Sequence, residues 1–402
     1  MTPPATEALP TPEELVARAR ALAPALRDAQ TATEAARLVS PEIFEQLLDA
    51  ELHKVLMPAR YGGCEYGLNN YADVAFEVAR GCGATGWVFA ITSKYQAFLA
   101  MFPPQAQDDV WGDNRRAVTA ASFTPAGTAT PTDGGYRLSG TWMYCSGVDN
   151  STWMVVATTV PPASGDGPGV KGYALAPTSD FSLEDNWHVV GLAGTGSKNV
   201  HCEDVFIPEH RFLTFEDTMS GNPPGAEVNA APLYSVPLFS MISVSLCAAI
   251  MGMAQGAYDE FVGTTRARVT RGAALSQPVP MAEIPSIQLR VGDAASSIDA
   301  ARLLVDRDCR DIMATINAGQ GLTEQQRARN KGNLGFATQL SLQAVDRIFE
   351  ASGGGGLFSS GRLQRYWRDI HAASSHISMN WDAVGALHGR IALGLPPGPA
   401  QF

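Results

Sequence analysis

The residue pattern changes twice along the chain, from helical to β-rich and back to helical. This order of patterns constrains the fold more than any other feature. Residues from Pro12 to about Trp111 carry helical periodicity. From Ala117 to about Phe215, short β-rich runs alternate with Gly, Pro and Asp-Gly turns, which predicts an antiparallel sheet or small barrel. From about Val236 onward, long helical patterns return. We therefore expect an α+β chain with three domains: an N-terminal helical domain (1–112), a central antiparallel β domain (113–217) and a C-terminal helical bundle (218–402).

Composition narrows the possible functions. The 402 residues are 45% hydrophobic and only 17% charged, as in a globular protein, and the net charge of -11 comes without a basic block. This balance disfavours nucleic acid as a partner. The six cysteines lack the spacing of a metal site or a disulfide framework, so they are typical of buried thiols in a reducing compartment. Without a signal-like start or an apolar run of roughly 18 residues, the sequence predicts a cytoplasmic protein without a membrane span.

Nucleotide-binding signatures are missing from the sequence. It contains neither G-x-G-x-x-G after a strand nor G-x-x-x-x-G-K-[ST], and no repeat with a period of 20 to 50 residues. A nicotinamide-binding Rossmann domain is therefore not expected. If the chemistry is redox, the chain does not collect its own hydride.

Several short segments contain donors and glycines of the kind that hold a cofactor. Gly140 to Trp153 reads GTWMYCSGVDNSTW, in which Ser-Gly also suits a simple turn between strands. Gly191 to Ser197 reads GLAGTGS, and its glycines would let backbone approach a planar ring or a phosphate. Arg268 stands four residues before Gly272, and Gly353 to Gly356 form a tetraglycine. Each segment alone also fits a hairpin, a turn or a solvated helix end.

Together these segments resemble the flavin-binding signatures of the acyl-CoA dehydrogenase superfamily, and the resemblance covers nearly the whole chain. It implies a hydroxyl beside flavin N5 at Ser146, an aromatic packed on flavin at Trp187 and an arginine, Arg268, that reaches a cofactor phosphate across a subunit contact. The cofactor-binding residues implied in this way are Ser146, Trp187, Gly194, Thr195, Ser197, Arg268, Gly354 and Gly355.

The C-terminal segment separates two branches of this superfamily. Acyl-CoA dehydrogenases of the commonest branch carry a catalytic glutamate where this chain has Ile377. Instead, the run RDIHAASSHISMNW is similar to flavin-dependent aromatic hydroxylases, including the oxygenase components for 4-hydroxyphenylacetate and steroid-derived phenols. We expect His376 to hold a phenol as phenolate or to return a proton to the hydroxide that leaves. The expected catalytic residues are His376 and Ser146, with His371 secondary, although either histidine also suits a satisfied core position.

The resemblance implies the oxygenase component of a two-component flavin monooxygenase. Reduced FMN or FAD would arrive by diffusion from a separate NAD(P)H:flavin reductase, and O2 would form a C4a-hydroperoxyflavin that Ser146 keeps bound. The substrate would be a small aromatic, with a phenol as the leading expectation, in an apolar cavity. Relatives that act on phenols often carry a histidine in the helix where this chain has Lys94, which could contact substrate or face solvent. The expected substrate-binding residues are Phe123, Tyr95, Tyr144 and His376.

Three alternatives remain open from the sequence. The same fold supports oxygenation at nitrogen or sulfur, and nothing in the sequence excludes it. An acyl-CoA dehydrogenase could use Asp259 or Glu260 as an unrecognised base. A flavin-binding protein without enzymatic activity would keep the same scaffold. Kinship also implies a homotetramer, built as a dimer of dimers whose subunits complete one another's flavin sites.

Overall fold

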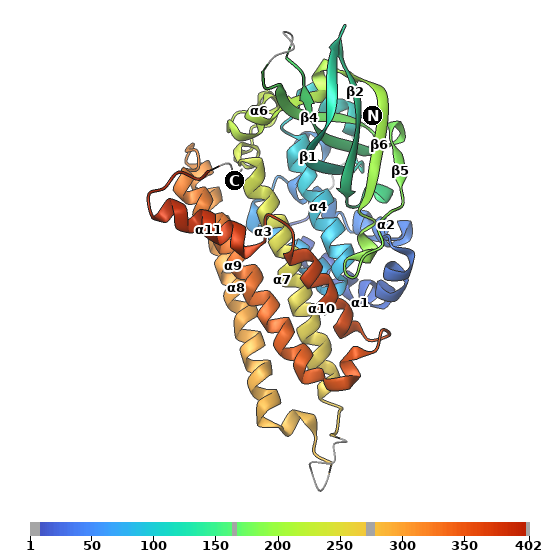
Figure 1. Cartoon of the computed structure of the whole chain (residues 1–402), viewed down its shortest axis with the longest axis vertical. Coiled ribbons are helices and arrows are strands. Elements are labelled where there is room, and N and C mark those ends of the chain that lie inside the picture. The colour runs from blue at the N-terminus through green and yellow to red at the C-terminus, as the bar shows by residue number, and fades with distance from the viewer. Residues whose placement is uncertain (1–8, 163–166, 271–277, 399–402) are drawn as a thin grey trace, which may run out of the picture.

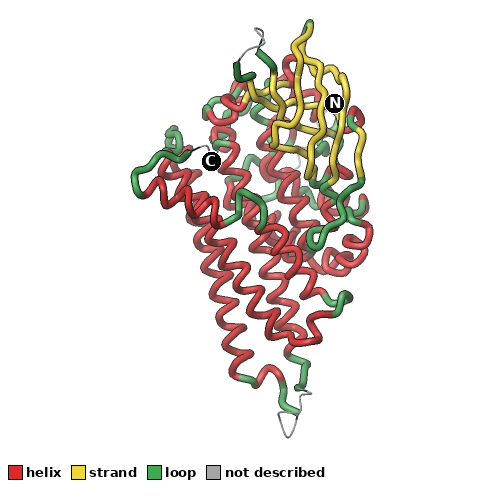
Figure 2. Tube along the Cα trace, viewed as in Figure 1, coloured by secondary structure: helices red, strands yellow, loops and turns green. Residues whose placement is uncertain are grey.

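The computed structural model describes residues 9–162, 167–270 and 278–398. Figures 1 and 2 show an elongated molecule with a sheet at one end and long, roughly parallel helices running away from it. The helices of the first third lie beside and behind the sheet, next to the helix that begins the C-terminal bundle. The expected order of helices, sheet and helices is confirmed.

The N-terminal part begins with two capped helices and ends around a fully buried one. Thr11 makes a reciprocal capping box with Glu14, and Ser40 accepts a hydrogen bond from the backbone N–H of Ile43. Every residue of α4 is buried, so this helix lies at the centre of the molecule. The helices are α1 (Pro12–Ala36), α2 (Pro41–Asp49), α3 (Leu68–Gly81), α4 (Gly83–Leu99) and α5 (Pro104–Trp111).

The central part is one seven-stranded sheet with the order β5-β6-β2-β1-β3-β4-β7. The expected antiparallel pairing holds for every neighbouring pair except β1 and β3, which run parallel, so the sheet is mixed. The strands are β1 (Thr119–Thr132), β2 (Gly135–Cys145), β3 (Trp153–Val160), β4 (Val170–Pro177), β5 (Ser182–Glu184), β6 (Lys198–Pro208) and β7 (Phe212–Thr214).

A buried tryptophan explains two glycines in this sheet. Gly127 and Gly140 are paired across β1 and β2, and a Cβ on either would come within 3 Å of the Trp142 ring. Trp142 donates its ring N–H to the Ala157 carbonyl at 2.7 Å, which satisfies its one polar atom. Trp142 is therefore part of the sheet's own core.

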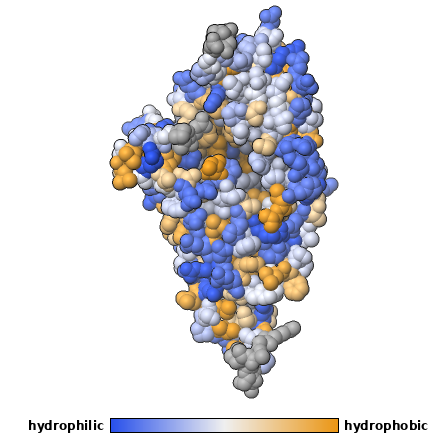
Figure 3. Space-filling view, viewed as in Figure 1, coloured by the Kyte–Doolittle hydropathy of each residue, from blue (hydrophilic) through white to orange (hydrophobic). Residues whose placement is uncertain are grey.

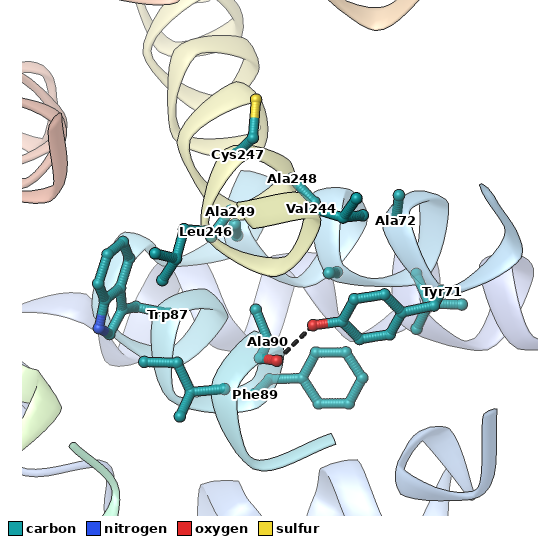
Figure 4. Close-up of a cluster of buried hydrophobic side chains, with 14 of the residues drawn as sticks. Tyr71, Ala72, Trp87, Phe89, Ala90, Val244, Leu246, Cys247, Ala248 and Ala249 are labelled. Atoms are coloured by element: carbon teal, nitrogen blue, oxygen red, sulfur yellow. Dashed lines mark hydrogen bonds between the residues drawn. The ribbon is translucent and has the colours of Figure 1, made fainter. Parts of the chain in front are cut away.

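The C-terminal part is built on α7, the most apolar long helix. Among the described residues, α7 alone is long and apolar enough to cross a membrane, but 83% of its most apolar window is buried inside the protein. Figure 4 shows it packed across α3 and α4, where the Tyr71 hydroxyl donates to the Ala90 carbonyl. The helices are α6 (Phe215–Met219), α7 (Leu238–Thr265), α8 (Pro285–Asn317), α9 (Glu324–Ser352), α10 (Arg362–Ser374) and α11 (Trp381–Ala392).

Candidate functional site

A chain of three buried hydroxyls begins directly after β2. Ser146 Oγ lies 2.6 Å from Ser197 Oγ, which lies 2.6 Å from Thr195 Oγ1. Thr195 donates its only proton to the Leu192 carbonyl at 2.8 Å. Ser197 must therefore donate to Thr195, and Ser146 must donate to Ser197. As a result, Ser146 Oγ offers lone pairs to any group placed beside it and acts there as an acceptor.

Two glycines bring this hydroxyl chain against the helices of the first third. Gly147, with φ of +75°, lies so close to α4 that a Cβ would be 2.9 Å from Val88 Cγ1. Gly194 lies against α1 and α4, where a Cβ would be 2.5 Å from Thr33 Cγ2 and 3.0 Å from Ala84 Cβ. Packing therefore fixes the backbone of both turns. At Gly194, the absence of a side chain allows the loop to lie close to both helices.

Residues of α10 hold the loop of residues 187–197 in place. Asp369 accepts a hydrogen bond from the Leu192 backbone N–H at 2.6 Å, and Arg368 donates to the Val190 carbonyl at 2.6 Å. Complete burial raises the pKa of Asp369 to about 7, and the hydrogen bond from Leu192 opposes that rise. Sequence reasoning quoted the Arg-Asp pair but missed this positioning role.

Two aromatic side chains lie on the outer side of the hydroxyl chain. Tyr144 has φ of 62°, a left-handed conformation that is uncommon outside glycine, and its side chain is 65% exposed. Its ring meets Trp187 edge to face, with the ring centroids 6.0 Å apart. Trp187 is fixed by a hydrogen bond from its ring N–H to the Leu192 carbonyl at 3.0 Å. The predicted Trp187 and Tyr144 therefore meet in the structure.

A second cluster of predicted residues surrounds Lys94 on α4. Tyr95 and Phe123 pack with their ring centroids 5.8 Å apart, and Lys94 Nζ lies 4.2 Å and 5.2 Å from these two centroids. The option that Lys94 faces solvent is wrong, since its side chain is only 1% exposed. Burial lowers its pKa well below the usual value for lysine. Tyr95 and Phe123 therefore form aromatic walls around an amine.

His376 lies in the turn between α10 and α11, next to the same helix. Its ring centroid is 6.2 Å from that of Trp87, which lies two helical turns before Lys94 on α4. Figure 4 shows Trp87 beside Leu246 of α7. Figure 3 shows this face of the molecule hollowed between the sheet and the C-terminal helices. Sequence reasoning missed Trp87, which only the seven-residue spacing to Lys94 could have indicated.

The hydrogen bonding of His376 defines which of its nitrogens is available. The Ser378 backbone N–H donates to Nδ1 at 3.2 Å, so a neutral ring carries its proton on Nε2. Desolvation, followed by the charges of Lys94 and Lys331, lowers the pKa of His376 to about 4. Although the His376 side chain is exposed to solvent, this lowering of its pKa favours the neutral ring near pH 7. His376 therefore offers a hydrogen-bond donor and is a weak base.

His371 is not part of this cluster. Its Nε2 lies 2.9 Å from the Asp346 carboxylate of α9, and its ring packs 4.4 Å from that of Trp367. Trp367 also donates to Asp346 and stacks on Phe349. His371 thus contributes to the contact between α10 and α9, and its expected secondary catalytic role stays a prediction.

The remaining predicted cofactor residues form a third cluster. Arg268 donates to the Ser352 carbonyl at 3.0 Å and lies against Gly355 in the turn Gly353–Leu357. Figure 1 places this turn where α7 and α9 end, at the end of the bundle remote from the sheet. Arg268, Gly354 and Gly355 therefore meet one another but not Ser146 of the same chain. Gly272 lies outside the described residues.

The cluster at Ser146 has the features that a reduced flavin needs. Ser146 presents an acceptor, which suits an N–H group of the kind that reduced flavin carries at N5. The backbone at Gly147 and Gly194 is held close to α4, and Trp187 supplies an aromatic face beside it. The residues present therefore fit the group. Fold and site together define a flavin-binding protein of the acyl-CoA dehydrogenase fold.

Comparison with known proteins agrees with this class. Residues 11–112 match the N-terminal domain of acyl-CoA dehydrogenases, and residues 244–381 match their C-terminal domain. The chain is 40% identical to the FADH2-dependent resorcinol hydroxylase, oxygenase component, of a Rhizobium species, over 95% of each chain.

Solved structures give the same result. The 3-HSA hydroxylase from Rhodococcus sp. RHA1 superposes with a TM-score of 0.89 at 33% identity and covers 95% of this chain and 97% of its own. XiaF from a Streptomyces species, in complex with FADH2 and glycerol, superposes with a TM-score of 0.88 at 29% identity over 97% and 98% of the two chains.

The chain therefore belongs to the oxygenase components of flavin-dependent monooxygenases with the acyl-CoA dehydrogenase fold. The family and class of enzyme that the resemblance implied are thereby confirmed.

Proposed function

We propose that this protein uses O2 and reduced FAD or FMN, supplied by a separate NAD(P)H:flavin reductase, to hydroxylate a small phenolic substrate. The observation that carries the proposal is the hydroxyl chain, which leaves Ser146 Oγ as an acceptor at the position where the family resemblance puts flavin N5. The relatives support the substrate class, since the named activities of two of them concern resorcinol and 3-HSA.

The residues of the two clusters divide the work in this proposal. When bound, the reduced flavin supplies one hydride equivalent and activates O2. Ser146 accepts a hydrogen bond from the ring N–H, while Asp369 and Arg368 keep the loop of residues 187–197 in place. His376 donates from Nε2 toward the oxygen atom that leaves. One atom of O2 enters the substrate as a hydroxyl group, and the other leaves as water after taking up a proton. The aromatic walls at Tyr95 and Phe123 exclude water.

A dehydrogenase activity is disfavoured by the carboxylates available. Ile377, at the place of the family's catalytic glutamate, is 71% exposed and has no acid group. Asp259 is already bound by Arg80 Nε at 2.5 Å and by Gln255, and Glu260 faces Arg362 at 3.9 Å. The two acids proposed as alternative bases are thus engaged in ion pairs on α7. Oxygenation at nitrogen or sulfur remains the alternative activity, and product analysis with amines and thioethers separates it from phenol hydroxylation.

We also propose a homotetrameric, cytoplasmic enzyme with the three domains 1–112, 113–217 and 218–402. The separation between Ser146 and the cluster of Arg268, Gly354 and Gly355 supports assembly, because only a neighbouring subunit would bring both to one flavin. Exposed apolar side chains on α8, such as Leu289 and Leu303, would be covered in such an assembly.

Rapid mixing with oxygen tests the proposed function. The protein with anaerobically reduced FAD or FMN is mixed with oxygenated buffer, and absorbance is followed from the near ultraviolet to the visible. We expect a transient band distinct from both reduced and oxidised flavin, with its lifetime shortened at least tenfold in Ser146→Ala. Ser341→Ala is the matched control, since Ser341 is a buried serine bonded within α9. Direct return to oxidised flavin in the unchanged protein would overturn the proposal.

A further inference from the structure

The amine of Lys94 is buried without a counter-charge. No hydrogen-bond or ion-pair partner lies within reach of its Nζ among the described residues, and desolvation is the only effect that acts on its pKa. Burial of an unpaired amine costs free energy, and the cost is greater if the amine is protonated. Burial therefore favours the neutral amine, whose lone pair can accept a proton when the group that gives it stays beside Nζ as the counter-charge.

The surroundings of Lys94 select what that group can be. The walls are the rings of Tyr95 and Phe123, and Phe123 in turn packs on Phe98 and Tyr173, with centroids 5.8 Å and 5.6 Å away. Such walls suit a flat aromatic ring. The amine, 4.2 Å and 5.2 Å from the two ring centroids, would then meet a polar atom carried on that ring.

Several titratable groups face Lys94, and among them it is the amine that lies against the rings of Tyr95 and Phe123. On α4 itself Tyr95 is buried and its pKa lies well above 10, with Cys145, Tyr71 and Tyr173 acting on it in the same direction after desolvation. From α9 and from the α10–α11 turn, Lys331 and His376 face the same region. His376 stays neutral with its proton on Nε2 and its Nδ1 occupied, so it can donate a hydrogen bond where Lys94 can accept a proton.

We propose that Lys94 Nζ binds the ring hydroxyl of the phenolic substrate and removes its proton, so that the site accepts only aromatics with an ionisable hydroxyl. This inference deepens the proposed function and rests on it. The O–H bond of the phenol breaks, its proton forms a new N–H bond on Nζ, and the electron pair stays on oxygen. The result is a phenolate beside an ammonium group, which together carry no net charge.

This deprotonation also explains why a phenol suits the proposed oxygenation reaction. A phenolate pushes electron density into its ring and makes the ring carbons better nucleophiles toward an electrophilic oxygen. An ether in place of the hydroxyl has no proton to give and leaves the amine unpaired. Sites built to bond a substrate hydroxyl reject the analogue without it by large factors. We therefore expect methoxybenzenes to bind at least a hundredfold more weakly than the corresponding phenols.

The test uses 4-nitrophenol, whose phenolate absorbs visible light while its phenol form does not. The flavin-free protein is titrated with the probe at a pH where the free probe is mostly phenol, and binding is measured in parallel by calorimetry. We expect the bound probe to show the phenolate band. Lys94→Gln, which can bond the hydroxyl but not hold its proton, should bind the probe without the band. Lys94→Met should bind at least tenfold more weakly, and His376→Gln should keep the band.

Three results would overturn the inference: no binding of the probe, a bound probe that stays in the phenol form, or a phenolate band that persists in Lys94→Met. The test needs no flavin, so its failure is distinguishable from failure of the proposed function. A transient band after mixing with oxygen, combined with a bound phenol that keeps its proton, would leave the oxygenase in place and remove the role of Lys94. Circular dichroism of each variant shows that its fold is unchanged.

Discussion

Replacing Ser197 by alanine should change how the protein distinguishes reduced from oxidised flavin. In the unchanged protein, the proton of Ser146 is directed to Ser197 Oγ at 2.6 Å, so Ser146 accepts from its free side. Reduced flavin carries a hydrogen on N5, whereas oxidised flavin carries a lone pair there. The hydroxyl chain therefore favours the reduced form. In Ser197→Ala the proton of Ser146 is released and can turn toward a lone pair on N5.

The magnitude follows from one hydrogen bond gained or lost. A buried hydrogen bond contributes about 1.5 kcal/mol, and a buried group left unsatisfied costs about 1 to 3 kcal/mol. We expect the ratio of dissociation constants for oxidised and reduced FAD to fall about tenfold or more, since about 1.4 kcal/mol corresponds to a factor of ten. Anaerobic and aerobic fluorescence titrations measure both constants. An unchanged ratio in Ser197→Ala, with normal folding, would refute the deduced direction of the hydroxyl chain.

Three further predictions concern stability. Asp369→Asn keeps an acceptor for the Leu192 N–H but removes a carboxyl whose folded pKa is about 7 instead of 3.8, so its stability relative to the unchanged protein should rise by a few kcal/mol as the pH rises from about 4 to 7. Asp369→Ala also loses the acceptor, so denaturant unfolding should show it to be less stable than Asp369→Asn at every pH. Burial lowers the pKa of His53 to about 3, so folding stability should fall as the pH drops below about 6.5. His53→Leu removes this titrating group, so its acid unfolding, followed by circular dichroism, should occur at a lower pH. Lys94→Met should raise the melting temperature by a few degrees, because it removes an unpaired buried amine that costs about 1 to 3 kcal/mol; a lower melting temperature would indicate a structural role.

The sequence was most informative where local signals decide the structure. The helical periodicity expected from Pro12 coincides with the start of α1, and the change from helical to alternating patterns marks the sheet. The parallel pairing of β1 and β3 could not be predicted in this way, because turn signals indicate which strands follow one another and not which edges they join. The link between Ser146 and Ser197 likewise depends on the pairing of Cys145 with Lys198 across β2 and β6.

The site was harder to predict from the sequence because α4 does not follow the usual helical pattern of one buried face and one exposed face. Since α4 is buried on all sides, it has no polar face, and Lys94 in the run TSKYQ looks like a surface residue. The predicted site residues divide into separate clusters in one chain for a related reason. Sequence motifs show which residues a family uses, while the distance between Ser146 and Arg268 depends on how subunits assemble.

Isotope labelling can show whether one atom of O2 enters a phenol at this site. The protein is supplied with photochemically reduced FAD or FMN, resorcinol or a related phenol, and 18O2, and the products are examined by mass spectrometry. We expect a hydroxylated product with one 18O atom, formed in proportion to the reduced flavin that is consumed. Quantitative formation of hydrogen peroxide without any labelled product, across phenols that bind at Lys94, would contradict it.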